Sequence, residues 1–289
     1  MSNAPMETIE LRKQRDFSAV ISTGFQFVRQ NWKTLYRPLI FICLPPYLVA
    51  SFFFGSFFRT AFTNAQAGII GSPGAAFGSM ALGYVLMILS GLLMYAMVYE
   101  YMRHYMQHHG LAPTTGELWK ATSRQLPAYF AIAVLAGILI FAGVFLLFVG
   151  ALWLAIVFTM AFPLRSFEGA GITDCIGRSF KLIKGHWWET FGLVLVLGML
   201  IGFLGYFIYL PFMMLTGFSA MSGMENPAEM GERMGWVMTV FMLLTGVVTV
   251  LLQPLLLVPV GLQALSLMEE KEGRGLLERV EQATMPPTA

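Results

Sequence analysis

Long apolar runs dominate this chain of 289 residues and leave few folds open to it. Hydrophobic residues make up 57% of the sequence and charged residues 12%. Several runs reach the ~20 residues that cross the ~30 Å hydrocarbon layer of a membrane. Because that layer holds no water to satisfy exposed backbone groups, such runs must form helices or a closed barrel. The runs therefore predict an all-α integral membrane protein.

The limits of these runs predict six transmembrane helices. We place the helices at residues 38–58, 77–100 with an extension to 109, 128–148, 151–163, 191–216 and 236–268. The third and fourth join as a tight hairpin through Val149-Gly150. The last run exceeds one crossing at ~1.5 Å of rise per residue, so we expect a break at Gln253-Pro254 or at Pro259. Pro45 and Pro46 remove two backbone donors and should kink the first span.

The positions of the cations predict how these spans are oriented. The chain has eighteen Lys and Arg residues, and all except Arg59 and Arg233 fall in segments on one side of the predicted spans. Cationic loops stay preferentially on the cytoplasmic side of a membrane. With an even number of spans, we expect a multi-pass protein of the bacterial inner membrane whose N- and C-termini are both cytoplasmic. The net charge of +2 makes nucleic acid an unfavourable partner.

Three further segments are apolar on one side at helical spacing, which predicts about three interfacial amphipathic helices. These segments are 16–32, 114–126 with Thr114 or Thr115 as its N-cap, and 171–187. The expected domains are then a flexible polar N-terminus (1–15), a single six-span membrane domain (16–270) and a charged cytoplasmic tail (271–289).

A shift of 155 residues aligns two of the amphipathic segments. Phe25-Gln-Phe-Val-Arg-Gln-Asn-Trp32 then matches Phe180-Lys-Leu-Ile-Lys-Gly-His-Trp187 in its Phe, aliphatic, cationic and Trp positions. Each segment leads into a span of the same expected orientation. This predicts a parallel internal repeat with units starting near residues 16 and 171, while shared composition of two basic segments is the simpler explanation.

The stretch from Glu168 to Trp188 is the most specific in the chain. Glu168 ends a span, and Arg178, Ser179, Leu182, Lys184, Gly185 and Trp188 follow in an amphipathic helix before the next span. This pattern resembles the six-helix membrane domain family of bacterial glycerophosphoryl diester phosphodiesterases and its uncharacterised relatives. The sequence departs from that family in lacking the soluble phosphodiesterase barrel. The resemblance therefore implies a membrane fold and not hydrolysis.

Cations and Trp residues occur together in the three amphipathic segments. Cations near an anionic leaflet gain ~1 kcal/mol each, and Trp prefers the headgroup level. Either they serve topology and anchoring alone, or they form a surface that binds lipid headgroups or a partner protein. The candidate residues of such a surface are Arg29, Trp32, Lys33, Trp119, Lys120, Arg124, Arg178, Lys181, Lys184 and Trp187.

Two other sets of residues could carry chemistry. Glu100, His104 and His108 share a helix face and could supply metal ligands, but a solvated helix end, with Glu100 paired to Arg103, explains them equally well. Pro45, Pro46, Glu168, Gln253 and Pro254 could mark a transport path through broken helices. Glu168 could instead pair with Arg178 or cap the next helix. No metal or other cofactor is expected from either set.

The sequence carries no HExxH, GxSxG, P-loop or CxxC motif and no convincing Ser/His/Asp set. We therefore expect a non-enzymatic membrane scaffold or accessory subunit whose basic amphipathic helices contact membrane lipids or other membrane proteins. The alternative is a permease or lipid-handling transporter built on the Pro-broken spans.

Overall fold

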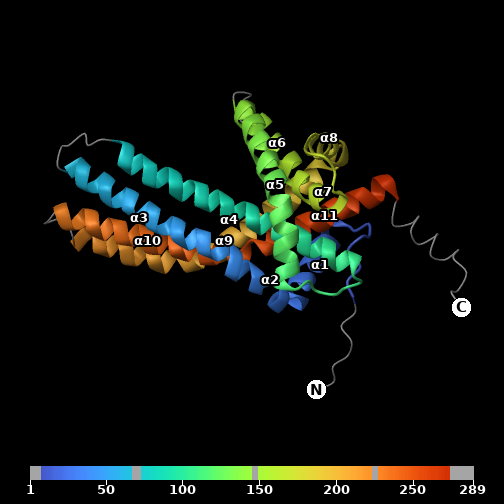
Figure 1. Ribbon diagram of the computed structural model, residues 1–289, viewed down its shortest axis with the longest axis horizontal. Helices are drawn as coiled ribbons and strands as arrows, with labels where there is room; N and C mark the ends of the chain where they lie inside the picture. The colour runs from blue at the N-terminus through green and yellow to red at the C-terminus, as the bar shows by residue number, and fades with distance from the viewer. Residues whose placement is uncertain (1–7, 67–72, 145–148, 223–226, 274–289) are drawn as a thin grey trace, which may run out of the picture. The chain divides into compact units, whose positions relative to one another are not determined.

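The computed structural model describes residues 8–66, 73–144, 149–222 and 227–273, and these residues form helices and short connections without a strand (Figure 1). Among these described residues, six helical segments are long and apolar enough to cross a membrane: Trp32–Ala61, Phe77–Gln107, Thr115–Val144, Val149–Glu168, Trp187–Phe207 and Glu232–Glu272. The chain is therefore an all-α multi-pass membrane protein, as the apolar runs predict.

The elements follow one another as short and long helices. They are α1 (Phe17–Gln30), α2 (Trp32–Pro38), the π-helical turn η1 (Leu39–Cys43), α3 (Leu44–Gln66), α4 (Pro73–Gln107), α5 (Thr115–Val144), α6 (Val149–Thr159), α7 (Ala161–Glu168), α8 (Ile172–Ile183), α9 (Trp187–Ser222), α10 (Pro227–Leu252) and α11 (Pro254–Glu272).

Several helices extend beyond the predicted limits. The amphipathic segment 114–126 is not a separate helix, because α5 continues from Thr115 through Pro127 into the span. In the same way α9 continues through Pro211. Val149 and Gly150, expected to connect a hairpin, are the first residues of α6, and residues 145–148 before them lie outside the described residues.

Proline positions explain the breaks. The last predicted span divides at Gln253, where Pro254 begins α11, while Pro259 stays inside that helix. The sequence had left Gln253-Pro254 and Pro259 as alternative positions for this break. Pro163 cannot donate to the carbonyl of Thr159, which is where α6 ends. The π-helical turn η1 directly precedes the helix that contains Pro45 and Pro46.

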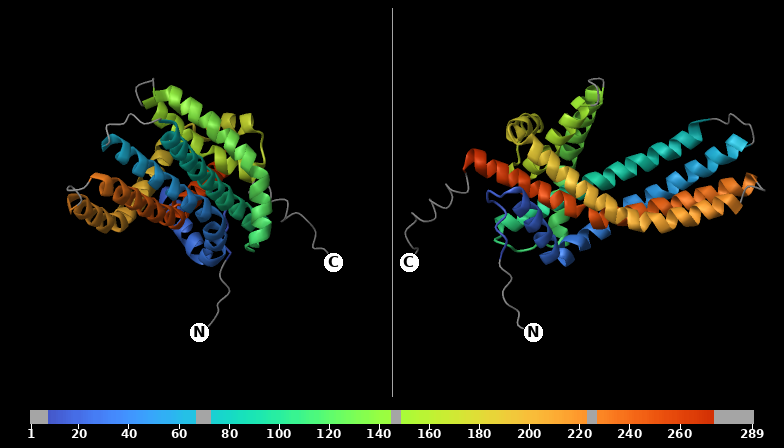
Figure 2. Two further views of the ribbon diagram at one scale, coloured as in Figure 1. Left: turned by 60° about the vertical axis from the view of Figure 1, so that its left-hand side comes forward. Right: turned by 180° about the vertical axis from the view of Figure 1, so that it is seen from behind.

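The predicted single membrane domain divides into two compact units. Unit 1 comprises Met1–Leu35, Tyr95–Gly198 and Pro254–Ala289, and unit 2 comprises Tyr36–Met94 and Met199–Gln253. Within unit 2, α3 and α10 run side by side (Figure 2). Gly55 faces Thr239 across this contact, and a Cβ at Gly246 would lie 2.5 Å from the Tyr47 ring. Small residues allow this close helix approach, as is common in membranes.

Hydroxyl groups bind carbonyl oxygens beside both helix irregularities of unit 2. The Tyr36 hydroxyl donates to the Leu251 carbonyl oxygen over 2.7 Å, close to the break at Gln253. Ser90 Oγ donates to the Cys43 carbonyl oxygen over 2.5 Å, at the end of η1. Backbone groups freed within a membrane need such partners, so side chains of the protein satisfy carbonyls next to these irregularities.

In unit 1, α11 packs along α1, and α8 packs against α5, α6 and α7. Gly24 permits the first contact, because a Cβ there would lie 2.5 Å from Cγ of Pro259. The second contact is an apolar cluster that includes Ile132, Phe158 and Cys175.

The helices α1 and α8 share their first residue and their buried positions at the shift of 155 residues, although α8 ends two residues earlier. Both helices begin at matching residues, Phe17 and Ile172, and the helices after them begin at Trp32 and Trp187. The buried positions of α1 (Val20, Gly24, Phe27 and Val28) match those of α8 (Cys175, Ser179, Leu182 and Ile183) without exception. This register supports the predicted repeat. Residues 17–35 are called the first copy below, and residues 172–190 the second copy.

The chain before α1 differs from the expected flexible segment. Residues 1–7 lie outside the described residues, but the residues that follow make specific contacts. Leu11 is buried, the Ile9 backbone N–H donates to the Tyr105 hydroxyl over 3.2 Å, and the Arg15 N–H donates to Ser266 Oγ over 2.8 Å. These contacts join the segment to α4 and α11.

Candidate functional site

A pocket of about 620 Å³ lies where α1 meets α2. It is lined by Arg29, Gln30, Trp32, Lys33 and Thr34. The Lys33 ammonium lies 5.7 Å from the centroid of the Trp32 ring, within the range of cation–π attraction. Trp32 is 57% exposed. Because two lining residues are cationic and none carries a carboxylate, the pocket is positively charged.

Partly buried hydrogen bonds hold the turn that forms this pocket. The Tyr101 hydroxyl lies 2.6 Å from Thr34 Oγ1 and donates to Asn31 Oδ1 over 3.1 Å. Asn31 Nδ2 in turn donates to the Phe27 carbonyl oxygen at the end of α1. Arg29 is in the last turn of α1, where the helix dipole favours a cation. The chain therefore presents Arg29 and Lys33 from a fixed backbone.

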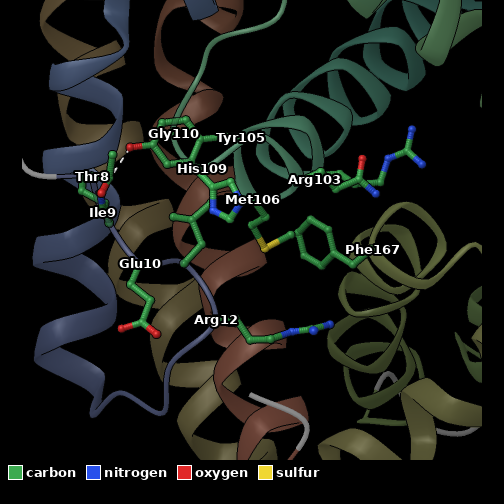
Figure 3. A pocket seen from close by; sticks show the side chains of 12 residues that line it. Thr8, Ile9, Glu10, Arg12, Arg103, Tyr105, Met106, His109, Gly110 and Phe167 are labelled. Atoms are coloured by element: carbon green, nitrogen blue, oxygen red, sulfur yellow. Dashed lines mark hydrogen bonds between the residues drawn. The ribbon is translucent and has the colours of Figure 1, made fainter. Parts of the chain in front are cut away.

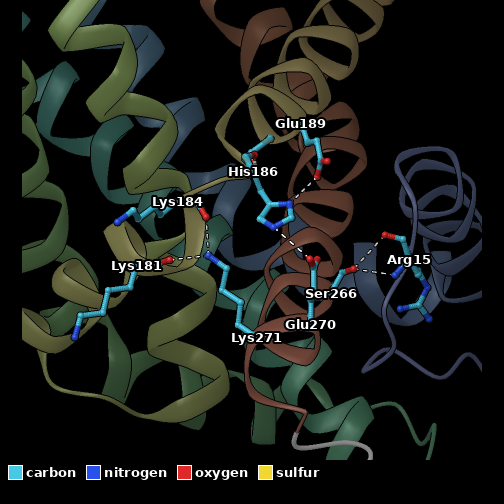
Figure 4. Close-up of polar contacts among 9 residues, drawn as sticks. Arg15, Lys181, Lys184, His186, Glu189, Ser266, Glu270 and Lys271 are labelled. Atoms are coloured by element: carbon cyan, nitrogen blue, oxygen red, sulfur yellow. Dashed lines mark hydrogen bonds and ion pairs between the residues drawn. The ribbon is translucent and has the colours of Figure 1, made fainter.

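The second copy is covered by the end of α11, as Figure 4 shows. The Lys271 ammonium donates to the carbonyl oxygens of Lys181 and Lys184, each over 2.8 Å. Carbonyls at the C-terminal end of a helix lack partners within the helix, and the dipole there attracts cations. The side chains of Lys181 and Lys184 point away from Lys271 (Figure 4). Lys271 thus caps α8 through the backbone.

Carboxylates balance the charge of the second copy. His186 lies between Glu189, at 3.1 Å from its Nδ1, and Glu270, at 3.3 Å from its Nε2. Trp187, which matches the exposed Trp32, stacks on Phe191 with a centroid distance of 5.1 Å. The two copies therefore share their helix starts and buried positions but present different surfaces.

Arg178 joins three elements by ion pairs. Its guanidinium lies 2.8 Å from Glu168 at the end of α7 and also pairs with Glu272 of α11. The Glu168 side chain is 6% exposed. Pairing with Arg178, one of the roles that the sequence left open for Glu168, is present in the structure. These pairs give Arg178 a structural function. The sequence alone had grouped Arg178 with the candidate lipid-binding cations.

Trp119, Lys120 and Arg124 lie in the first turns of α5 and are exposed. Thr114 is the cap: its Oγ1 accepts from the Glu117 N–H over 3.3 Å, and Glu117 Oε2 accepts from the Thr114 N–H over 2.9 Å. This reciprocal pair is a capping box. None of the side chains of Trp119, Lys120 and Arg124 lines the pocket at Arg29.

Glu100 is buried in a polar cluster. Its Oε1 accepts from Ser166 Oγ over 2.8 Å, and Ser166 Oγ lies 2.6 Å from the Tyr129 hydroxyl. Its Oε2 lies 2.5 Å from the Arg103 guanidinium, which is the pairing expected from the sequence. A buried carboxylate needs such partners. Here α4 and α7 supply them, and Tyr129 of α5 extends the cluster through Ser166.

The structure does not bring Glu100, His104 and His108 together as metal ligands. Glu100 faces Ser166 and Arg103, whereas the His104 and His108 rings stack 3.9 Å apart. Their Nδ1 atoms lie within hydrogen-bond distance of the carbonyl oxygens of Leu111 and His104. Among the described residues, no group of three His, Cys, Asp or Glu side chains could hold a metal ion. The helical spacing was correct, but the side chains turn to other partners.

The residues of the predicted transport path belong to different units. Pro45, Pro46 and Gln253 are in unit 2, and Glu168 and Pro254 are in unit 1. Glu168 faces Arg178, as described above. Within each unit these residues are accounted for by helix breaks or ion pairing.

Two groups outside the predicted sites have shifted pKa values. Burial lowers the pKa of Arg15, and the nearby Glu10 carboxylate partly opposes this shift. Arg15 and His186 line a pocket of about 500 Å³ that also includes Asp16, Glu189 and Glu270. Burial raises the pKa of the Cys175 thiol, so this thiol is unreactive and packs in the apolar cluster described above. No local sequence signal placed Arg15 beside α11.

Comparison with known proteins gives no further identification. No protein-family model, no curated protein and no solved structure matches the chain.

Proposed function

We propose that the protein is a non-enzymatic scaffold or accessory subunit of the bacterial inner membrane, and that its first copy binds anionic lipid headgroups on the cytoplasmic side. The observation that carries this proposal is the pocket with two cations, an exposed Trp and no carboxylate. Trp is enriched at the headgroup level of membranes, and cations there attract anionic lipids. The charge asymmetry of the sequence supports the same side for this pocket.

Carboxylates lie close to the cations of the second copy, so the proposal covers the first copy only. Its Lys181 and Lys184 remain exposed, but His186 has two carboxylates within 3.3 Å and Arg178 is paired with Glu168. At the positions that match Lys33 and Thr34, the second copy has Trp188 and Glu189. An anionic headgroup would therefore meet one fewer cation and one additional carboxylate there.

Lipid retention by the full-length protein tests this proposal. The protein is purified in nonionic detergent, mixed with equal amounts of phosphatidylglycerol and phosphatidylcholine, and bound lipids are counted by native mass spectrometry. The variant Arg29→Gln/Lys33→Gln should bind phosphatidylglycerol about 30-fold more weakly, since two cations contribute about 1 kcal/mol each. Phosphatidylcholine retention should not change.

The matched control is Lys120→Gln/Arg124→Gln, which removes the same charge from the exposed start of α5. It should leave most phosphatidylglycerol binding intact. Equal losses in the two double variants would show that net charge alone attracts the lipid, and would contradict a site at the first copy.

A transport role is the second candidate, because Glu100 is a buried carboxylate on a span-forming helix and such groups favour function. Its bonds to Ser166 and Arg103 give it a structural explanation of equal strength. Once a substrate class has been found by screening, uptake by the Glu100→Gln protein in proteoliposomes separates the transport role of Glu100 from its structural role.

A further inference from the structure

A second pocket, of about 530 Å³, lies between the segment before α1 and the end of α4 (Figure 3). Its volume is within the range of small-molecule sites. Apolar side chains, among them Ile9, Met106 and Phe167, line it together with the cations Arg12 and Arg103. All of these residues belong to unit 1. The pocket combines an apolar wall with the charged side chains of Arg12, Arg103 and Glu10, and Arg103 also pairs with Glu100.

His109 lines this pocket from a strained backbone position. Its φ is 50°, and it is the sole non-glycine residue with positive φ in the part of the chain that the structure describes. The Gly110 N–H donates to the Tyr105 carbonyl oxygen over 2.9 Å. This is the bond of a Schellman cap, in which the position of His109 is usually glycine. A side chain here costs conformational energy.

The neighbouring residues explain why the cap keeps its shape. The Tyr105 hydroxyl accepts from the Ile9 N–H, and Thr8 packs so close to Gly110 that a Cβ at Gly110 would lie 2.5 Å from the Thr8 methyl group. The cap and the segment before α1 thus hold each other in place. The imidazole projects from this cap among the pocket residues, as Figure 3 shows. Strained residues are found at ligand sites because surrounding contacts enforce them.

We propose that this pocket binds an amphiphilic small molecule with a phosphate group and a short apolar tail. Arg12 and His109 would contact the phosphate, since guanidinium and imidazolium groups donate charged hydrogen bonds to its oxygens. Ile9, Met106 and Phe167 would contact the tail. Glu10 also lines the pocket, and Figure 3 draws its carboxylate pointing away from His109. The phosphate group can come from a soluble metabolite or from a lipid.

Binding of n-hexyl phosphate to the full-length protein in nonionic detergent, measured by calorimetry, tests the proposal. Hexyl phosphate should bind at least tenfold more tightly than inorganic phosphate, and hexanol should not bind measurably. Dihexanoyl phosphatidic acid, measured in parallel, separates the two sources: tighter binding than hexyl phosphate indicates a lipid, and weaker binding a soluble ligand. No detectable binding of either amphiphile would overturn the proposal.

Two variants locate the site. Arg12→Gln should weaken hexyl phosphate binding at least tenfold, whereas Lys13→Gln, with the same charge change on an exposed neighbour, should stay within twofold. His109→Gly should raise the Tm, because glycine adopts this φ without strain, and should still weaken binding at least threefold. A His109→Gly protein that binds as tightly as the wild type, or equal losses in Arg12→Gln and Lys13→Gln, would contradict the site.

The double variant Arg29→Gln/Lys33→Gln removes any binding of hexyl phosphate at the first copy, and Arg12→Gln should weaken the remaining binding at least tenfold when it is added to that variant. If Arg12→Gln had no effect in the double variant, or if the double variant bound no hexyl phosphate, the second site would be overturned. The proposal for the first copy and the proposal for this pocket can therefore fail independently.

Discussion

The two copies show how one helical pattern supports two different surfaces. The helices α1 and α8 bury matching positions, and matching Trp residues begin the helices that follow. In the first copy the turn after the helix is held by Tyr101, and Arg29 and Lys33 line an open pocket. In the second copy the end of α11 covers the turn with Lys271 and Glu270.

The difference arises from which part of α11 each copy meets. Near the start of α11, Pro259 packs on α1, where Gly24 leaves room for it. The charged end of α11 meets α8, where Glu272 pairs with Arg178 and Lys271 donates to a carbonyl oxygen at the end of that helix. The register of the apolar face is therefore set by local sequence, whereas the charge of the surface depends on a helix distant in the sequence.

The largest effect is expected at the contact that distinguishes the first copy. Gly24→Leu should lower the free energy of unfolding by about 1–3 kcal/mol, because its side chain would overlap the Pro259 ring in a closely packed contact. Gly177→Leu on α8 is the control, since no atom lies within 4 Å of a Cβ there. It should be neutral or stabilising, because leucine favours helix over glycine. Unfolding by SDS in mixed micelles, followed by circular dichroism, measures both, and equal losses would contradict the packing difference.

A smaller effect is expected at the turn of the second copy. Gly185 has a φ of 91°, and left-handed backbone costs other residues roughly 1–2 kcal/mol. Gly185→Ala should destabilise the protein by about this amount in the same SDS titration. The matching residue of the first copy, Gln30, is helical, so Gln30→Ala should change stability little. If Gly185→Ala were also neutral, the turns of the two copies would be equivalent.

Local sequence predicted the spans because each needs only a sufficient run of apolar residues. Helix limits were less predictable. Pro127 could end a helix or be contained in it, and the choice depends on packing; α5 continues through it. The ion pair between Glu168 and Arg178 was foreseeable because the residues are close in sequence. The partner Glu272 was not, since it lies on a helix that only the fold brings near.

The two candidate sites show the same contrast between local sequence patterns and contacts that only the fold makes. Arg29, Trp32 and Lys33 are near neighbours in sequence, so a local pattern could group them, and they line one pocket. Arg12 and His109 line the other pocket but are far apart in the sequence, and the polar composition of residues 1–15 predicted a flexible segment there. The signal that could have found this segment is Ile9 and Leu11, two apolar residues in a polar stretch.

The smallest effect is expected at the helix starts. Asp16 caps α1, and its Oδ1 accepts from the Ala19 N–H over 2.8 Å. The N-cap residue of α8 is Gly171, which has no side chain to cap the helix. Asp16→Gly gives the first copy the cap residue of the second, and glycine replaces a capping side chain at a cost of only a few tenths of a kcal/mol. Asp16→Ala should cost more, about 1 kcal/mol, because alanine neither caps nor favours the extended backbone of this position. The same SDS titration ranks the two variants. If Asp16→Gly cost as much as Asp16→Ala, the carboxylate of Asp16 would matter through its charge at the helix dipole, and the two copies would differ in electrostatics at both ends of the helix.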